Sequence, residues 1–98
     1  MWLVLALSFV ITNPENTRRI EVAFDSDISY SGYILDFGDG KTAFQSSDEM
    51  PTKWVRTHKY EKSGQYVVTL LILRGDRVIK ALSKMVRVRS ASEGDKET

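Results

Sequence analysis

The sequence contains no cysteine, and its 98 residues include only two prolines and a single histidine. Without cysteine the chain has no disulfide, no thiolate metal ligand and no thiol nucleophile, so its stability has to come from packing. The lone histidine, His58, excludes both a histidine cluster for a metal and a histidine pair for proton relay. These absences remove several common kinds of catalytic centre, and we expect that the chain is not an enzyme.

A strong net charge is missing too, because fourteen Lys and Arg against thirteen Asp and Glu leave a formal charge of +1. We therefore expect no nucleic-acid binding, since no overall field attracts a polyanion. With 42% hydrophobic and 28% charged residues, the chain suits one hydrophobic core. The prediction is one domain over residues 1–89, followed by a mobile polar tail at 90–98 that lacks large apolar residues.

No apolar run is long enough to cross a bilayer, which takes about 20 such residues. The longest run, from Trp2 to Ile11, is interrupted by Asn13, Pro14 and Glu15. It lacks the basic residues before it and the small-residue cleavage site after it that a signal peptide needs. Two interpretations stay open, a first core strand or a truncated targeting segment, and the strand-like length favours the first. We expect no membrane insertion.

What the chain does contain is a series of short apolar or alternating runs separated by turn-forming residues, which is typical of a sandwich or barrel. Ile20, Val22 and Phe24 alternate most clearly with polar neighbours, as in a half-buried strand. The loop at 45–52 is expected to cross between two sheets. The alternation shifts within the last run, which predicts a bulge near Ser83. The expected strands cover residues 3–11, 19–24, 32–37, 42–44, 54–60, 65–73 and 78–88.

Three motif blocks follow one another along the chain: Leu-Asp-Phe-Gly-Asp-Gly at 35–40, His-Lys-Tyr at 58–60, and Ser-Gly-Gln-Tyr-Val-Val-Thr-Leu at 63–70. The first block predicts a tight turn, because Gly accepts positive φ and Asp bonds backbone two residues on. Its Asp-Phe-Gly also occurs in protein kinases, but no other kinase motif is present. The motif residues are Asp36, Phe37, Gly38, Asp39, Gly40, His58, Tyr60, Gly64 and Tyr66.

In this order and at this spacing the blocks resemble the PKD (polycystic kidney disease) domain, over roughly Arg19 to Val88. Leu35 stands where that family usually has Trp, and Ser63 where it usually has Pro. The resemblance implies an all-β fold, an Ig-like two-sheet antiparallel sandwich of about seven strands, with Tyr66 near a sheet corner. It also implies a non-catalytic accessory module of a larger extracellular or cell-surface protein, acting as a rigid spacer and contacting protein or carbohydrate.

Carboxylates in the expected loops suggest a calcium site, because hard cations prefer carboxylate oxygens and some proteins that resemble PKD modules bind calcium. The candidate ligands are Asp25, Asp27, Asp36 and Asp39. The alternative interpretation is that Asp36 and Asp39 bond nearby backbone N–H groups in the turn. No other cofactor is expected.

Several further features have plain structural explanations. Arg74-Gly75-Asp76 matches the tripeptide that integrins recognise, but Gly followed by Asp is also what a hairpin turn requires. Positive charge on the last strand is typical of a solvated edge strand, where lysines discourage aggregation. Large aromatic side chains are expected to be buried, although exposed ones would suit carbohydrate or protein contact. The aromatic candidates are Trp2, Tyr30 and Trp54.

A catalytic triad of Ser63, His58 and Asp36 lacks both a nucleophile elbow and an oxyanion arrangement, so catalysis is not expected. The leading hypothesis is therefore the accessory module described above. The alternative function is a self-associating adhesion or assembly domain, which pairs through an exposed edge strand at the first or the last run.

Overall fold

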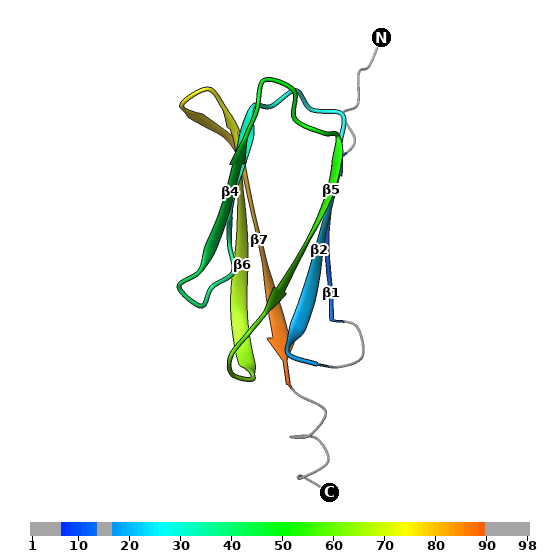
Figure 1. The fold of residues 1–98 in the computed structure, drawn as a ribbon, viewed down its shortest axis with the longest axis vertical. Helices are drawn as coiled ribbons and strands as arrows, with labels where there is room; N and C mark the ends of the chain where they lie inside the picture. Colours follow the sequence, from blue (N-terminus) through cyan, green and yellow to red (C-terminus); the bar gives the residue numbers. More distant parts are fainter. Residues whose placement is uncertain (1–6, 14–16, 90–98) are drawn as a thin grey trace, which may run out of the picture.

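The computed structural model describes residues 7–13 and 17–89 as a sandwich of two antiparallel sheets (Figure 1). Of the apolar run from Trp2 to Ile11, the part from Leu7 lies in a strand, whereas residues 2–6 and the predicted tail at 90–98 lie outside these described residues. Within them, no helix is long and apolar enough to cross a membrane. The strands are β1 (Leu7–Thr12), β2 (Arg19–Ser26), β3 (Gly32–Asp36), β4 (Thr42–Ser46), β5 (Lys53–Lys59), β6 (Gly64–Arg74) and β7 (Arg77–Val88). The predicted all-β, seven-stranded, Ig-like sandwich is confirmed.

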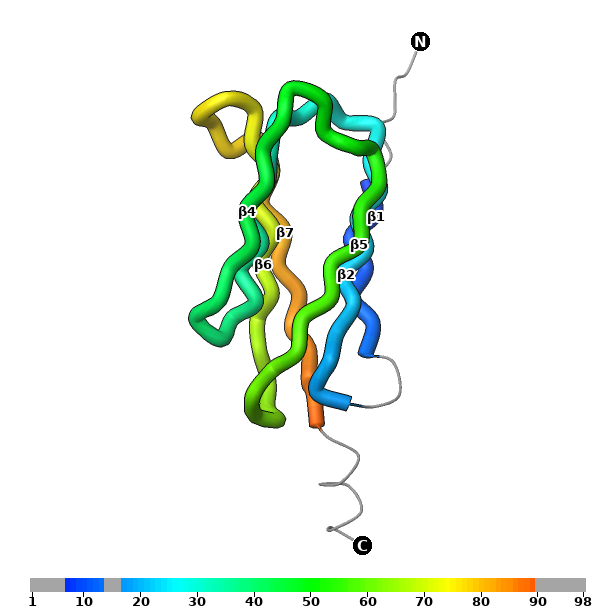
Figure 2. Tube along the Cα trace, in the orientation of Figure 1, coloured from blue at the N-terminus to red at the C-terminus, as the bar shows by residue number. Residues whose placement is uncertain are grey.

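The two sheets have the strand orders β1-β2-β5 and β4-β3-β6-β7. At one end of the sandwich the chain crosses from one sheet to the other between β2 and β3 and again between β4 and β5, and at the opposite end it crosses between β5 and β6 (Figure 2). The predicted crossing at 45–52 is present, although β4 extends to Ser46 before the crossing begins. The strands β1 and β7 run side by side where the edges of the two sheets meet.

The core lies between the sheets and is built from alternate residues of each strand. Ile20 and Val22 of β2 are fully buried, as the alternation predicted. Val68, Leu70 and Ile72 of β6 face them from the other sheet, and none of the three is exposed to solvent. Burying a side chain of this size stabilises a fold by roughly 1.5–3 kcal/mol, so these two strands provide much of the packing that replaces disulfides.

The inward face of β5 is polar for a core strand. Its half-buried residues are Trp54, Arg56 and His58, while the residues between them are exposed. The first buried residue after the strand is Tyr60, which has no exposed surface. β5 is an edge strand, so long side chains on its inner face can fill the gap to the other sheet while their polar ends reach partners there.

The bulge in the last hairpin is at Ile79 rather than near Ser83. Leu73 pairs with Val78 and Ile72 pairs with Lys80, which leaves Ile79 as the extra residue. The two-residue turn at Gly75 and Asp76 sets the pairing at the tip, whereas the core requires Leu82 opposite Leu70. The extra residue therefore has to lie between the tip and Leu82, and alternation in the sequence cannot tell where.

Candidate functional site

The three motif blocks meet at one end of the sandwich, around the turn between β3 and β4. Asp36 Oδ1 accepts a hydrogen bond of 2.8 Å from the backbone N–H of Gly38, and Asp39 Oδ1 accepts one of 3.1 Å from the N–H of Lys41. The N–H of Phe37 donates to the carbonyl of Lys41 at 3.1 Å. Each carboxylate thus bonds backbone two residues on, which is the turn interpretation made from the sequence.

Gly38 lies against the neighbouring strand β6 and has a φ of 85°. A Cβ at this position would lie 2.5 Å from the backbone oxygen of Val67. Gly40 has a φ of 90°, but a Cβ there would have no heavy atom within 4 Å. The first glycine is required by both conformation and space, and the second by conformation alone.

His58 of β5 joins the turn to the other sheet. Its Nε2 lies 2.8 Å from Asp39 Oδ2, and the two side chains are only 11% and 13% exposed. Its ring stacks on Phe37 with centroids 3.9 Å apart. Burial alone raises the pKa of Asp39, but the hydrogen bonds from His58 and from the N–H of Lys41 outweigh it and hold the pKa below its ordinary value.

Tyr60 also contacts the turn between β3 and β4. Its hydroxyl donates a buried hydrogen bond of 2.7 Å to the carbonyl of Phe37. Burial, with a smaller contribution from the carboxylate of Asp39, raises the pKa of Tyr60, so the hydroxyl keeps its proton for this bond. The ring of Tyr60 stacks on that of Tyr66 at 4.0 Å, and Tyr66 donates 2.7 Å to the carbonyl of Lys62. The bond to backbone four residues upstream is the geometry expected of a tyrosine corner.

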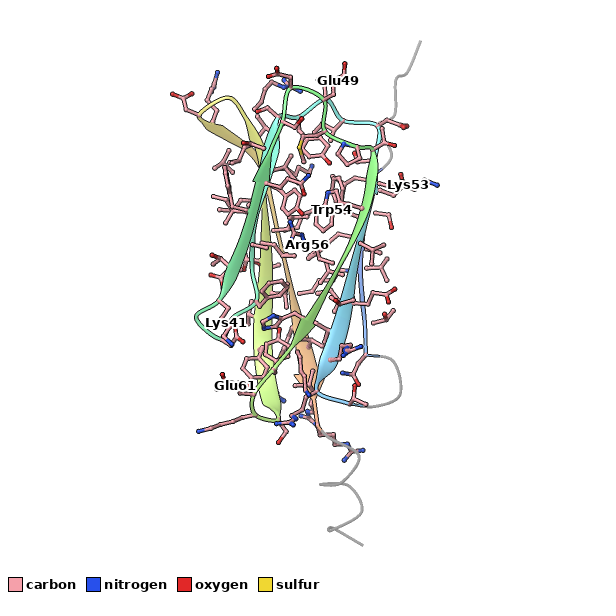
Figure 3. The ribbon with its side chains drawn as sticks, viewed as in Figure 1. Lys41, Glu49, Lys53, Trp54, Arg56 and Glu61 are labelled. Carbon is pink, nitrogen blue, oxygen red and sulfur yellow. The ribbon has the colours of Figure 1, made fainter. Side chains whose placement is uncertain are left out.

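These contacts show that most of the motif residues serve the fold. His58 has a carboxylate partner, but that partner is Asp39. It is not Asp36, the carboxylate of the catalytic triad considered from the sequence with Ser63. Beside the network is an open depression of about 250 Å³, lined by Asp39, Lys41, Glu61, Lys62 and Tyr66. The Lys41–Glu61 ion pair at 3.4 Å lies at its rim (Figure 3). This volume is below that of usual small-molecule pockets, about 300–1,000 Å³.

The four calcium candidates lie at two ends of the sandwich. Asp25 is paired with Lys53, and Asp27 begins the crossing at that end. Asp39 contacts His58, which is paired with Ile20, so five strand positions, roughly 16 Å, separate it from Asp25. Among the described residues, no group of three or more His, Asp or Glu side chains could hold a metal.

A second polar cluster lies midway along the sandwich, on the side where β4 and β5 face each other. Arg56 Nε donates 2.7 Å to the hydroxyl of Tyr33, and its Nη2 donates 3.4 Å to Oε1 of Gln45 on β4. Trp54 stacks on Tyr33 at 4.1 Å and on Phe24 at 5.2 Å. Both Trp54 and Arg56 point between the sheets, whereas Lys53 points away (Figure 3). These residues close an otherwise open side of the sandwich.

Arg74 and Gly75 of the integrin-type tripeptide are engaged in the fold. Arg74 folds back and donates to the carbonyl of Ser29 from Nε at 3.1 Å and from Nη2 at 2.7 Å. The N–H of Gly75 donates to Ser31 Oγ at 2.7 Å. The hairpin explanation therefore accounts for these residues.

Two of the three aromatic candidates pack within the protein. Tyr30 is 8% exposed, and its hydroxyl donates to the carbonyl of Pro51. Burial raises the pKa of Tyr30, so this donor also keeps its proton. Trp54 is stacked as described, and Trp2 lies outside the described residues. Among the aromatic side chains that the structure describes, the exposed one is Phe44 of β4, at 61%, which sequence reasoning missed. In the sequence, Phe44 alternates with polar residues on a short strand. This pattern indicates which neighbours share a face of the strand with Phe44, but it does not indicate whether that face is exposed.

The fold and the motif network together define an immunoglobulin-like sandwich whose signature residues are structural. The sequence matches the family model "PKD domain" over residues 8–72, and the chain belongs to this family. The PKD domain is a non-catalytic type of module.

Two solved structures share the fold. The PKD1 domain of Vibrio anguillarum Epp superposes with a TM-score of 0.66 at 16% identity, covering 90% of this chain and 96% of that one. The PKD1 domain from Vibrio cholerae metalloprotease PrtV gives a TM-score of 0.66 at 20% identity, covering 90% of this chain and 100% of that one. Both are modules of larger proteins. Among proteins of curated function, none matches the sequence significantly.

Proposed function

We propose that this chain is an accessory module of a larger extracellular or cell-surface protein, in which it holds its neighbours apart and offers a surface for protein contact. The observation that carries the spacing role is the path of the chain. Leu7 of β1 pairs with Ser26 at one end of the sandwich, while Val88 of β7 pairs with Gly64 at the other. The chain thus enters and leaves at opposite ends, and β7 alone, with 12 residues, spans roughly 40 Å.

Rigidity between these ends follows from the motif network. The turn between β3 and β4 is bonded to His58 and Tyr60 at the far end of β5, so both sheets are joined there. At midheight Arg56 joins β5 to β3 and β4. Interactions at two levels oppose sliding of one sheet over the other, which suits a spacer.

Protein is favoured over polysaccharide as the contact. Sugar sites commonly use exposed rings, which combine apolar and polar contact. Among the described aromatic side chains, Phe44 is the one exposed large ring. Membership of the PKD family supports placement outside the cell, because proteins that contain such domains are typically extracellular or secreted.

The spacing role is tested by fusing a folded fluorescent reporter to each end of the 98-residue chain and measuring single-molecule energy transfer between the reporters. We expect a narrow distance distribution. The control replaces the chain with a Gly/Ser linker of equal length, which gives a broad distribution because it is a flexible coil. A distribution as broad as that of the linker would show that the chain is no rigid spacer.

A further inference from the structure

The outer face of the four-stranded sheet carries most of the large apolar side chains that the fold leaves exposed. Phe44 of β4 is 61% exposed, Val67 of β6 is 53%, and Val78 and Met85 of β7 are 54% and 67%. Half-buried Leu71 lies between them on β6. Together these side chains expose apolar surface on the order of 400 Å², within the range of the largest patches on monomers.

The outer face of the three-stranded sheet has a different character. There Val10 and Val55, 45% and 59% exposed, flank Ala23 in a single apolar row. The neighbouring positions are charged or polar. They include Arg19, Glu21, Asp25, Lys53, Thr57 and Lys59. An isolated row surrounded by charge is ordinary surface, whereas depletion of charge around several apolar residues is typical of an interface core.

The strand register arranges the apolar face of the four-stranded sheet in rows that run across it from β4 to β7. One row consists of Phe44, Ile34, Leu71 and Ala81. It has its largest side chain at the β4 edge and its smallest at the β7 edge. If the row is set opposite a reversed copy of itself, Phe44 lies against Ala81 and Ile34 lies against Leu71.

The next row towards the hairpin tip shows the same asymmetry in the opposite sense. It consists of Ser46, Gly32, Leu73 and Val78. Here the small residues lie at the β4 edge and the large ones at the β7 edge. Reversal places Ser against Val and Gly against Leu, so in this row each large side chain meets a small one.

We propose that this face binds a second copy of the chain, through a two-fold axis that lies between the sheets and runs along the strands. Such an axis places β4 of one copy over β7 of the other and keeps each row opposite itself, reversed. Phe44 then packs against Ala81 of the second copy, and Leu73 packs against its Gly32. Face-to-face sheets pack about 10 Å apart with their strands within about 30° of each other, which this axis allows. An isologous interface needs this kind of self-complementarity.

A polar row supports the same arrangement. It consists of Thr42, Asp36, Thr69 and Ser83. Thr69 and Ser83 hydroxyls already lie 3.0 Å apart on neighbouring strands. Reversal brings Asp36 opposite Thr69 of the second copy and Thr42 opposite its Ser83. Hydroxyls both donate and accept, so the row can be satisfied across the interface without an opposing pair of like charges.

The exposed apolar area of this face, on the order of 400 Å², is about half of what a specific interface buries on one partner. A specific interface usually buries about 800 Å² on each partner, with an apolar core and a polar rim. The two apolar rows supply apolar contact for such a core, and the polar row lies between them and the exposed pair Val67 and Met85. The inference names the partner for the protein-contact role proposed above and rests on it.

Two of the sheet edges, those formed by β5 and β7, are less suited to self-association. Arg56 on the inner face of β5 and Lys84 on that of β7, whose amine lies 5.7 Å from the ring of Phe9, are charged side chains directed inward at edge strands. Inward charges of this kind discourage pairing with another edge. At the edges formed by β5 and β7, pairing through a face is therefore favoured over edge-strand pairing, whereas pairing through the first strand, β1, stays a prediction.

Sedimentation equilibrium of the 98-residue chain from roughly 1 µM to 1 mM tests the proposal. We expect a monomer–dimer equilibrium whose dissociation constant rises at least about ten-fold in Phe44→Lys and in Ala81→Glu. The matched control is Val55→Lys, since Val55 is similarly exposed on an edge strand of the other sheet. Its dissociation constant should equal that of the wild type. A chain that stays monomeric throughout, or a dimer weakened only by Val55→Lys, overturns the proposal.

A mixture of the two variants tests the axis itself. In a dimer of Phe44→Lys with Ala81→Glu, the new lysine faces the new glutamate and the remaining Phe44 faces the remaining Ala81. We therefore expect the mixture to dimerise more tightly than either variant alone. No recovery in the mixture overturns the two-fold arrangement. A chain that is monomeric yet holds the reporters at a narrow distance overturns the dimer while leaving the spacing role intact.

Discussion

Two glycines of the β3–β4 turn share a backbone conformation but differ in their surroundings. Replacing Gly40 by Ala should cost roughly 1–2 kcal/mol, because its φ of 90° strains any side chain. Gly38→Ala should cost roughly 3 kcal/mol or more, because the new Cβ also meets the backbone oxygen of Val67 at 2.5 Å. Urea unfolding of both variants measures the difference. Equal losses would mean that the contact with β6 relaxes freely.

Tyr60 and Tyr66 both donate from their hydroxyls to a backbone carbonyl, one buried and one exposed. Tyr60→Phe leaves the buried carbonyl of Phe37 without this donor and should cost about 1–3 kcal/mol of unfolding free energy. Tyr66→Phe is the matched control and should cost less than about 1 kcal/mol, since water can replace its exposed bond to Lys62. The pair is compared by urea denaturation. A greater loss in Tyr66→Phe would reverse the assigned roles.

The carboxylate of Asp39 makes the free energy of unfolding depend on pH in the acidic range. Its pKa in the folded protein lies below its value in the unfolded chain, about 4, so the ionised carboxylate stabilises the fold above that pH. This stabilisation is lost as pH falls through the lowered folded pKa. Asp39→Asn should therefore be less stable than the wild type at pH 7, by roughly 1–3 kcal/mol, and the gap should close towards pH 2. Denaturant unfolding at pH 7 and at pH 2 measures the difference in stability between the wild type and Asp39→Asn. A difference that is the same at both pH values contradicts the lowered pKa of Asp39.

At the scale of the element, β5 shows how an edge strand is protected by its own side chains. Arg56→Ala removes the donor to Tyr33 and Gln45 and should destabilise the fold by about 1–3 kcal/mol while raising the tendency to aggregate. Thr57→Ala, on the exposed face of the same strand, should change stability by less than about 0.5 kcal/mol. Denaturation and light scattering on heating measure the two effects. An aggregation-resistant Arg56→Ala would show that the edge is protected otherwise.

The elements differ in how well the sequence predicts them, for physical reasons. The positions of β2 and β6 follow from alternation, because one face of each is buried and a one-residue shift would expose it. The polar inner face of β5 was visible only as a pattern, since partners such as Gln45 belong to the other sheet and only the fold brings them opposite β5. The bulge at Ile79 depends on the turn register and on Leu70 together, and no local pattern contains both. The turn bonds of Asp36 and Asp39 were predictable because they are local, whereas the His58–Asp39 contact is not.

At the scale of the whole molecule, the two ends of the sandwich have different chemistry. One end contains the motif network, in which Asp36 and Asp39 already accept hydrogen bonds. The other contains the crossings that follow β2 and β4. Asp25 and Asp27 flank the last residue of β2, Ser26, and Glu49 lies on the second crossing (Figure 3). Carboxylates separated by the length of the strands cannot bind one ion. Each end of the sandwich is therefore a separate candidate for calcium binding.

Thermal melts in EDTA and then in millimolar calcium address both. Because the turn carboxylates are engaged and the other end lacks a group of three ligands among the described residues, we expect no rise in melting temperature. A ligand that binds only the folded chain at 100 times its dissociation constant would add about 2.7 kcal/mol, which a melt detects easily. If a rise does occur, Asp25→Asn and Asp39→Asn show which end binds, since only the variant at that end removes it. A rise abolished by Asp39→Asn would mean that calcium displaces His58 from the network.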